Sequence, residues 1–193
     1  MPAISRESLM SLEAYAKARP DFRARAIAHK RLRTVHVGEH VTLQFEDELT
    51  VRYQIQEMLR IEKTFEVNGI QDELDAYNPL VPDGRNLKAT MLIEYENEAE
   101  RRVALGLLKG IEDRVWVQVE GCARVHAIAD EDLERENETK TSSVHFLRFE
   151  LGEEMAAALK YGVGLAVGVD HPNYTGESQV SNDSRQALVR DLR

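Results

Sequence analysis

Five side chains of the kinds that bind transition metals are the first candidates for chemistry in this sequence. They are two acids in a helix pattern, a histidine in a strand pattern and an Asp-His pair after an apolar run: Glu57, Glu62, His145, Asp170 and His171. Carboxylate and imidazole groups suit iron, manganese and zinc, and a metal with an open coordination position activates water or oxygen. If these side chains converge, the sequence predicts a metal-dependent enzyme or a metal-binding protein that uses Fe, Mn or Zn.

A second set of polar side chains suggests a different chemistry, the binding of a small molecule. Residues 77–86 contain two prolines and a Pro-Asp-Gly turn, so they form a loop, and this loop lies between a helix pattern and a strand pattern. A ligand between the helix and the loop would be contacted by Arg60, Tyr77, Asn78 and Arg85. The protein would then be a small-molecule sensor, whereas a rigid connector has the same loop composition.

Each metal candidate also has a purely structural interpretation. Glu62 lies at the edge of its apolar stripe, where it can reach solvent, and Glu57 can pair with Arg60 one turn later. His145 shares a strand face with Leu147 and Phe149 and is then a hydrogen-bonded histidine of the core. Asp170 can cap a turn before the following proline. Both interpretations are open at this stage.

The elements that position these residues follow one another between residues 49 and 95. Apolar residues at steps of three and four predict one continuous helix over 49–67, closed by Asn68-Gly69: Val51, Ile55, Met58, Ile61 and Phe65. Glu62 falls inside this stripe. Residues 70–77 are expected to form a short helical turn at most, and residues 87–95 a strand.

The first 34 residues predict a basic helical arm. Two helices are expected, separated by Pro20. Residues 1–35 hold eight Lys or Arg and three acids, a net charge of +5. The whole chain has a net charge of −9, so the remaining residues carry −14. An acidic body repels phosphate, which argues against nucleic-acid binding. We expect the arm to lie on acidic surface of its own chain or of a second subunit in a homodimer.

The remaining patterns predict an α+β fold in one domain. Alternating apolar residues predict a mainly antiparallel sheet, covered by helices, with strands near residues 35–46, 87–95, 114–129, 144–151 and 164–170. The arm would occupy residues 1–34, the α+β core residues 35–175 and a polar tail residues 176–193.

Composition excludes several classes of protein. The 193 residues are 42% hydrophobic, enough for one sizeable core. The single cysteine excludes an internal disulfide framework and cannot by itself hold an iron-sulfur cluster. No apolar run approaches the roughly 20 residues that span a bilayer, and residues 1–20 lack the apolar centre of a secretory signal. The expected compartment is therefore the cytoplasm. The sequence also contains no nucleotide-binding loop and no zinc signature.

Several segments together resemble one bacterial family, domain of unknown function 3501: RPDFRARAIAHKR, DAYNPL, PDGRNLKAT, GIEDRVWVQV, KTSSVHFLRFEL and GVDHPNY. The resemblance covers nearly the full length and assigns a role to no residue. It implies a genomic context beside rubrerythrin-like di-iron proteins and iron-sulfur oxidoreductases of the heterodisulfide-reductase type. A role near peroxide defence or iron-sulfur redox chemistry follows from that context.

The sequence therefore supports three hypotheses. The first is a cytoplasmic accessory protein that binds a rubrerythrin-like or iron-sulfur redox partner and is not itself a catalyst. The second is the metal-dependent enzyme or metal-binding protein, and the third is the small-molecule sensor.

Overall fold

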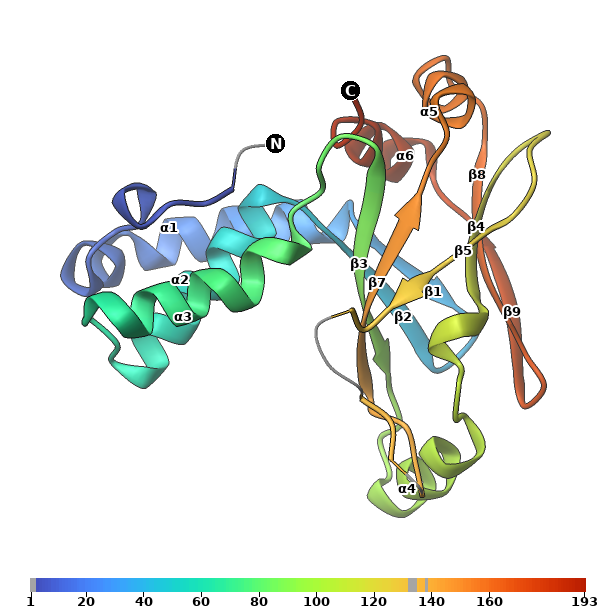
Figure 1. The fold of residues 1–193 in the computed structure, drawn as a ribbon, viewed down its shortest axis with the longest axis horizontal. Helices are drawn as coiled ribbons and strands as arrows, with labels where there is room; N and C mark the ends of the chain where they lie inside the picture. Colours follow the sequence, from blue (N-terminus) through green and yellow to red (C-terminus); the bar gives the residue numbers. More distant parts are fainter. Residues whose placement is uncertain (1–2, 132–134, 138) are drawn as a thin grey trace.

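The protein consists of a helical arm beside two stacked β-sheets (Figure 1). The computed structural model describes residues 3–131, 135–137 and 139–193. The helical arm is larger than the predicted basic arm of residues 1–34, since it contains α2 (Glu48–Glu62) and α3 (Val67–Tyr77) as well as α1 (Leu12–Arg31). Three shorter helices lie around the sheets: α4 (Glu98–Leu107), α5 (Glu153–Lys160) and α6 (Asn182–Val189). Among the described residues, no helix has both the length and the apolar character needed to cross a bilayer.

All strand pairs in the described residues are antiparallel, and they form two sheets where the sequence predicted one. Sheet A has the order β1-β2-β3-β7-β6 and sheet B the order β5-β4-β8-β9. The strands of sheet A are β1 (Thr34–Val37), β2 (Val41–Glu46), β3 (Asn86–Ile93), β7 (Val144–Glu150) and β6 (Ile128–Ala129). Those of sheet B are β5 (Val125–His126), β4 (Val115–Val119), β8 (Leu165–His171) and β9 (Tyr174–Gln179). The predicted α+β class is confirmed.

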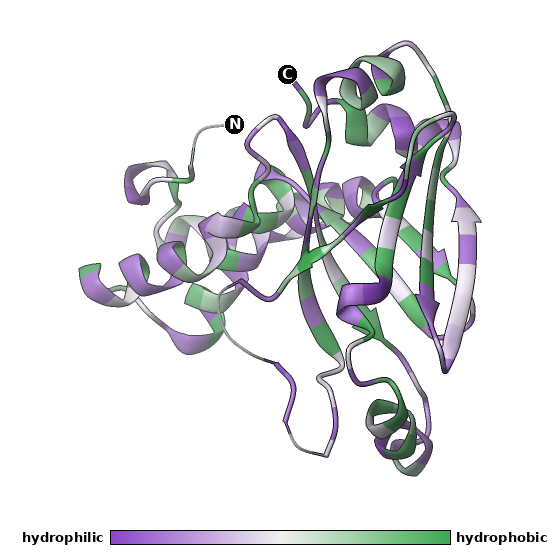
Figure 2. Cartoon of the chain, turned by 45° about the vertical axis from the view of Figure 1, so that its right-hand side comes forward, coloured by the Kyte–Doolittle hydropathy of each residue, from purple (hydrophilic) through white to green (hydrophobic). Residues whose placement is uncertain are grey.

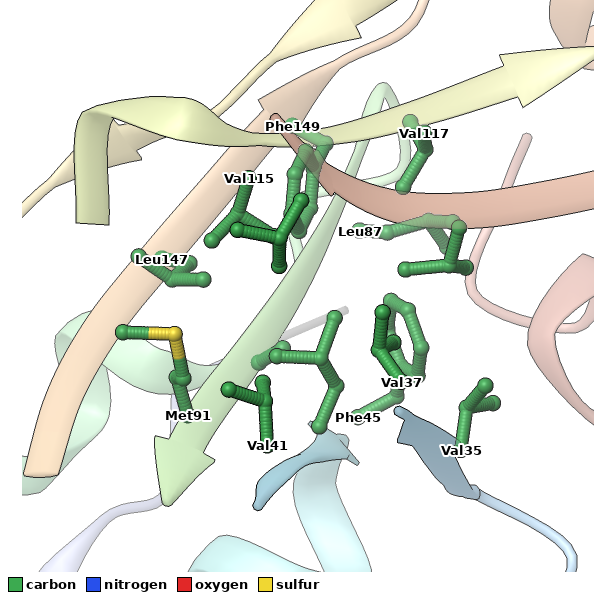
Figure 3. Close-up of a cluster of buried hydrophobic side chains, with 14 of the residues drawn as sticks. Val35, Val37, Val41, Phe45, Leu87, Met91, Val115, Val117, Leu147 and Phe149 are labelled. Atoms are coloured by element: carbon green, nitrogen blue, oxygen red, sulfur yellow. The ribbon is translucent and has the colours of Figure 1, made fainter. Parts of the chain in front are cut away.

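The main core lies between the two sheets (Figure 3). Phe45, Met91 and Phe149 of sheet A face Val115 and Val117 of sheet B, and all five side chains are fully buried. Alternation along the strands produces this layer, because successive residues point to opposite faces of a sheet. Hydrophilic and hydrophobic bands accordingly alternate along several strands in Figure 2. The outer face of sheet A is therefore the polar face.

The last residues complete the two-sheet body. Residues 174–179 form β9 and pair with β8, although the polar tail was expected to begin at residue 176. The Tyr174 hydroxyl donates to the Val37 carbonyl at 2.6 Å and accepts from the His40 amide at 2.9 Å, so β9 joins β1 of the other sheet. The α6 segment buries Ala187 and Leu188 against the body. Residues 176–179 are Gly, Glu, Ser and Gln, so their sequence has no apolar alternation that would predict a strand, and it is the pairing with β8 that makes them part of the sheet.

The first helix of the arm is continuous through Pro20. Proline removes one backbone donor and usually breaks a helix, so two helices were expected. In the structure α1 runs from Leu12 to Arg31 and packs against α2. Tyr15, Phe22 and Ala26 are buried on that side. Tertiary packing on α2 thus offsets the missing hydrogen bond.

The predicted helix over residues 49–67 is wrong, because it is two helices. Lys63 adopts a left-handed conformation (φ 55°) that ends α2, and α3 begins at Val67. Asn68 and Gly69 lie inside α3 and do not terminate a helix. The buried face of α2 contains Val51, Ile55 and Leu59, while Ile61 is 60% and Phe65 74% exposed. The apolar stripe therefore turns away from the core before it reaches Glu62, which is exposed.

Candidate functional site

The five predicted metal ligands do not converge. Glu57 and Glu62 belong to the arm, His145 to β7, and Asp170 and His171 to β8. In the described residues, one group of three His, Cys, Asp or Glu side chains is close enough to hold a metal ion, namely Glu112, Asp130 and His145. Of the predicted set, this group contains His145 alone.

Glu57 belongs to α2, and its carboxylate forms ion pairs with Arg19 of α1 and Arg60 of α2. Arg19 donates from Nε to Oε1 at 2.7 Å and from Nη2 to Oε2 at 2.9 Å, and the Tyr15 hydroxyl donates to Oε1 at 2.7 Å. Arg60 adds a contact at 3.2 Å. The Arg19 hydrogen bonds, followed by those of Tyr15 and Arg60, hold the pKa of the Glu57 carboxyl at about 2, below its usual 4.5. Glu57 is thus an ion-pair centre that joins the arm helices.

Replacing Glu57 with glutamine is expected to destabilise the protein at pH 7 by about 1–2 kcal/mol. A carboxyl group whose pKa is lowered by folding stabilises the protein at pH values above its unfolded pKa, here 4.5. This stabilisation is lost as the pH falls from 4.5 through the folded pKa of about 2. The full shift corresponds to about 3 kcal/mol, which solvent screening reduces. Urea unfolding of the variant should therefore depend less on pH between 4.5 and 2. The control Glu13→Gln alters an exposed pair with Lys17 and should change little; equal effects of both would contradict the assignment.

Asp170 and His171 point to opposite faces of β8, as consecutive strand residues must. Asp170 is exposed near His126 Nε2, at 3.5 Å, and Arg124, at 4.0 Å. His171 is buried: its Nε2 faces the Lys109 carbonyl at 3.0 Å, and its Nδ1 accepts from the Asn173 amide at 3.2 Å. The pair therefore forms no common site, and His171 fixes the β8–β9 turn.

His145 is fully buried, and oxygen atoms face both of its ring nitrogens. Nδ1 lies 2.6 Å from Asp130 Oδ2, while Nε2 lies 3.0 Å from the Ser142 carbonyl and 3.9 Å from Glu112 Oε2. Asp130 also accepts from the Phe146 amide at 2.9 Å, and its own backbone is left-handed at φ 46°. Burial raises the pKa of the Glu112 carboxyl, against the lowering effect of His145.

This geometry suits a hydrogen-bonded core histidine better than a metal ligand. Two atoms that bind one zinc ion lie roughly 3.4 Å apart in tetrahedral geometry, so the 2.6 Å contact between His145 and Asp130 is too short for a shared ion. Asp130 also faces Nδ1 of His145 whereas Glu112 faces Nε2, and a single metal ion binds only one nitrogen of an imidazole ring. The cluster thus attaches the segment after β6 to β7. Glu112 and Asp130 were not predicted, because no spacing in the sequence relates them to His145.

The outer face of sheet A and the arm enclose a cleft of about 570 Å³. Its floor consists of outward side chains of four strands: Thr34 and His36 of β1, Thr42, Gln44 and Glu46 of β2, Thr90 and Leu92 of β3, and Val144 and Phe146 of β7. Glu94 follows β3 on the floor, and the arm side contributes Lys30, Val51, Gln54, Tyr77 and Leu80. Polar and apolar groups therefore share one enclosed surface.

Hydrogen bonds order the floor of the cleft. Glu46 Oε1 accepts from the Thr90 hydroxyl at 2.8 Å, and the Thr42 hydroxyl donates to Glu94 Oε2 at 2.6 Å. His36 Nδ1 lies 2.9 Å from the Thr42 hydroxyl. Thr42, Glu46 and Thr90 were not predicted as site residues, although the alternation in β2 and β3 places them on one polar face.

Of the four predicted ligand contacts, Tyr77 alone lines this cleft. Asn78 bonds both backbone groups of Ile4, at 2.8 and 3.0 Å, and Arg60 belongs to the Glu57 ion pairs. Arg85 lies in a separate depression near the C-terminus, whose lining includes Tyr161, itself 91% exposed. The structure thus does not bring the four together, but it does place a cleft between the arm and the sheet.

Comparison with known proteins places the chain in a family. Residues 3–192 match the family described as Protein of unknown function (DUF3501). The chain belongs to this family. The match confirms the resemblance and gives the DUF3501 family the fold described above. None of the curated proteins compared with the chain matches it.

A solved structure is closely similar to this DUF3501 protein. It is the crystal structure of a novel protein of unknown function from Burkholderia pseudomallei K96243, with 58% sequence identity and a TM-score of 0.95. The similarity covers 100% of both chains. The helical arm and both sheets are therefore present in the Burkholderia pseudomallei protein as well.

Proposed function

We propose that this protein binds a small molecule in the cleft between the helical arm and sheet A. The observation that carries the proposal is the cleft itself, whose volume of about 570 Å³ falls within the usual range of ligand sites. Its lining combines five apolar side chains, among them Leu80 and Phe146, with ten polar or charged ones, among them Gln54 and Tyr77. Small-molecule sites join apolar surface to polar groups that fix the orientation of the ligand, and this cleft offers both.

A ligand in this cleft would contact two parts of the protein. Leu80 and Val51 belong to the helical side, and Thr90 and Phe146 to the sheet. The helical side has its own apolar cluster, separate from the core between the sheets. A bound molecule would hold the arm against the sheet, which is how binding becomes a signal in a sensor.

Filling the cleft tests the proposal. Leu92→Trp places an indole in the cleft, whereas Thr175→Trp adds the same group at an exposed position of β9. In a thermal-shift screen of a metabolite collection, a ligand at 100 times its Kd should raise the Tm of the wild type and of Thr175→Trp by about 5–10 °C. The Leu92→Trp variant should not respond. Ligands that stabilise all three proteins equally would refute the cleft as the site.

The accessory role beside a rubrerythrin-like or iron-sulfur redox protein stays a prediction from the family context. One surface feature is consistent with a protein partner: the turn between α2 and α3 exposes Phe65 by 74%, with Ile61 and Val67 beside it at 60% and 57%. Co-purification with di-iron or iron-sulfur proteins under peroxide stress tests the role. Light scattering tests the predicted homodimer.

A further inference from the structure

We infer that the ligand of this cleft is a small organic amine whose ammonium group pairs with Glu46. The inference rests on the proposed function and adds the chemical class of the ligand. It is carried by a buried carboxylate on the cleft floor that has no cationic partner within the described part of the chain.

Glu46 is 7% exposed, yet its two carboxylate oxygens accept from neutral hydroxyls. The Thr90 hydroxyl donates to Oε1 at 2.8 Å and the Thr50 hydroxyl to Oε2 at 2.5 Å. The buried Arg33 donates to the backbone carbonyl of Glu46, at 3.0 Å, and not to its carboxylate. In residues 3–131, 135–137 and 139–193, no Lys, Arg or His side chain forms an ion pair with this carboxylate. Buried carboxylates are usually paired, so the site lacks a cation.

An ammonium group supplies what the carboxylate lacks. A carboxylate offers about four lone-pair positions, and the two threonines occupy one on each oxygen. The three donors of an ammonium can use the remaining positions from the cleft side. Such charge-assisted hydrogen bonds are roughly twice as strong as those from neutral hydroxyls.

Apolar surface begins directly beside this polar group. Thr90 and Phe146 are paired across β3 and β7, and so are Leu92 and Val144. Leu80 also lines the cleft, and together with Phe146 it lines a neighbouring pocket. A molecule whose ammonium reaches Glu46 would lay a short apolar or aromatic body over these side chains, where aromatic rings also attract cations.

The other charges of the cleft favour a cationic ligand over an anionic one. Among the described residues that line the cleft, Lys30 is the single lysine or arginine, against Glu46 and Glu94. Its ammonium lies 5.8 Å from the centre of the Tyr53 ring. An anion would meet two carboxylates for one lysine, whereas an amine is attracted by both acids.

Three probes with matched skeletons test the ligand class: 2-phenylethylamine, 2-phenylethanol and 3-phenylpropanoate. By calorimetric titration of the full-length protein, the amine should bind at least 10-fold more tightly than the alcohol, and the acid more weakly than either. Glu46→Gln should weaken amine binding at least 10-fold and alcohol binding less than 2-fold. Glu94→Gln, the control at the exposed end of the floor, should weaken amine binding less than 3-fold.

If Glu46→Gln disturbs the start of α2 and fails to fold, Glu46→Asp serves instead, because it keeps the charge and withdraws it by one methylene. It should weaken the amine several-fold more than the alcohol. Equal affinities of amine and alcohol, or an equal loss of both in the Glu46 variants, would overturn the amine assignment. So would the absence of binding by all three probes. The cleft as a ligand site would then still be decided by the Leu92→Trp screen.

Discussion

Replacing Arg33 with methionine is expected to lower the free energy of unfolding by about 3–5 kcal/mol, because it leaves a buried charge without its partner. Arg33 is 1% exposed and forms an ion pair with Asp191, whose side chain is 3% exposed. Its remaining donors reach the carbonyls of Phe45, Glu46 and Ala187 at 3.0–3.1 Å. One guanidinium thus ties the end of α1 to β2 and to the C-terminal segment.

Chemical denaturation followed by circular dichroism measures this effect. Arg31→Met, two residues earlier on the exposed side of α1, is the matched control and should change stability by less than about 0.5 kcal/mol. The double variant Arg33→Met/Asp191→Leu removes both charges and should recover much of the loss. A loss below about 1 kcal/mol in Arg33→Met would contradict the role of the buried pair.

Replacing Gly168 with alanine is expected to cost about 3 kcal/mol, at the upper end of the usual range for overpacking. Gly168 pairs with Trp116 across β8 and β4. A Cβ at Gly168 would lie 2.2 Å from Cζ2 and 2.5 Å from Cε2 of the indole. Trp116 is 1% exposed, and Arg124 lies over it at 3.8 Å from the ring centre, so the indole has little room to move.

The single tryptophan of the chain reports on this site directly, since its fluorescence responds to displacement of the indole. Gly152→Ala is a suitable control, because a Cβ there meets nothing within 4 Å. Adding Trp116→Leu to Gly168→Ala makes room for the methyl group, so the two changes together should cost less than the sum of each alone. Strict additivity would show that the indole does not limit position 168.

The strands were predictable because their signal is local. Alternation along residues 34–46, 86–93 and 144–150 records which side of each strand is buried, and it also placed His145 correctly on a core face. The same logic failed for Glu62. A helical period shows where apolar residues align, but α2 ends at Glu62 with Lys63 as its left-handed cap, and Phe65 of the predicted stripe lies in the turn that follows. A break of that kind depends on how α3 packs back onto α2.

The sequence by itself determined the α+β class, the strand alternation and the family, because each depends on residue order over short segments. Only the tertiary structure decided which polar residues meet. Glu46 and Thr90 are separated by 44 positions, and the hydrogen bond between them exists because β2 and β3 pair in one register. The cleft likewise requires the arm to lie beside sheet A. Contacts between distant segments arise from packing and register, which residue spacing along one chain does not encode.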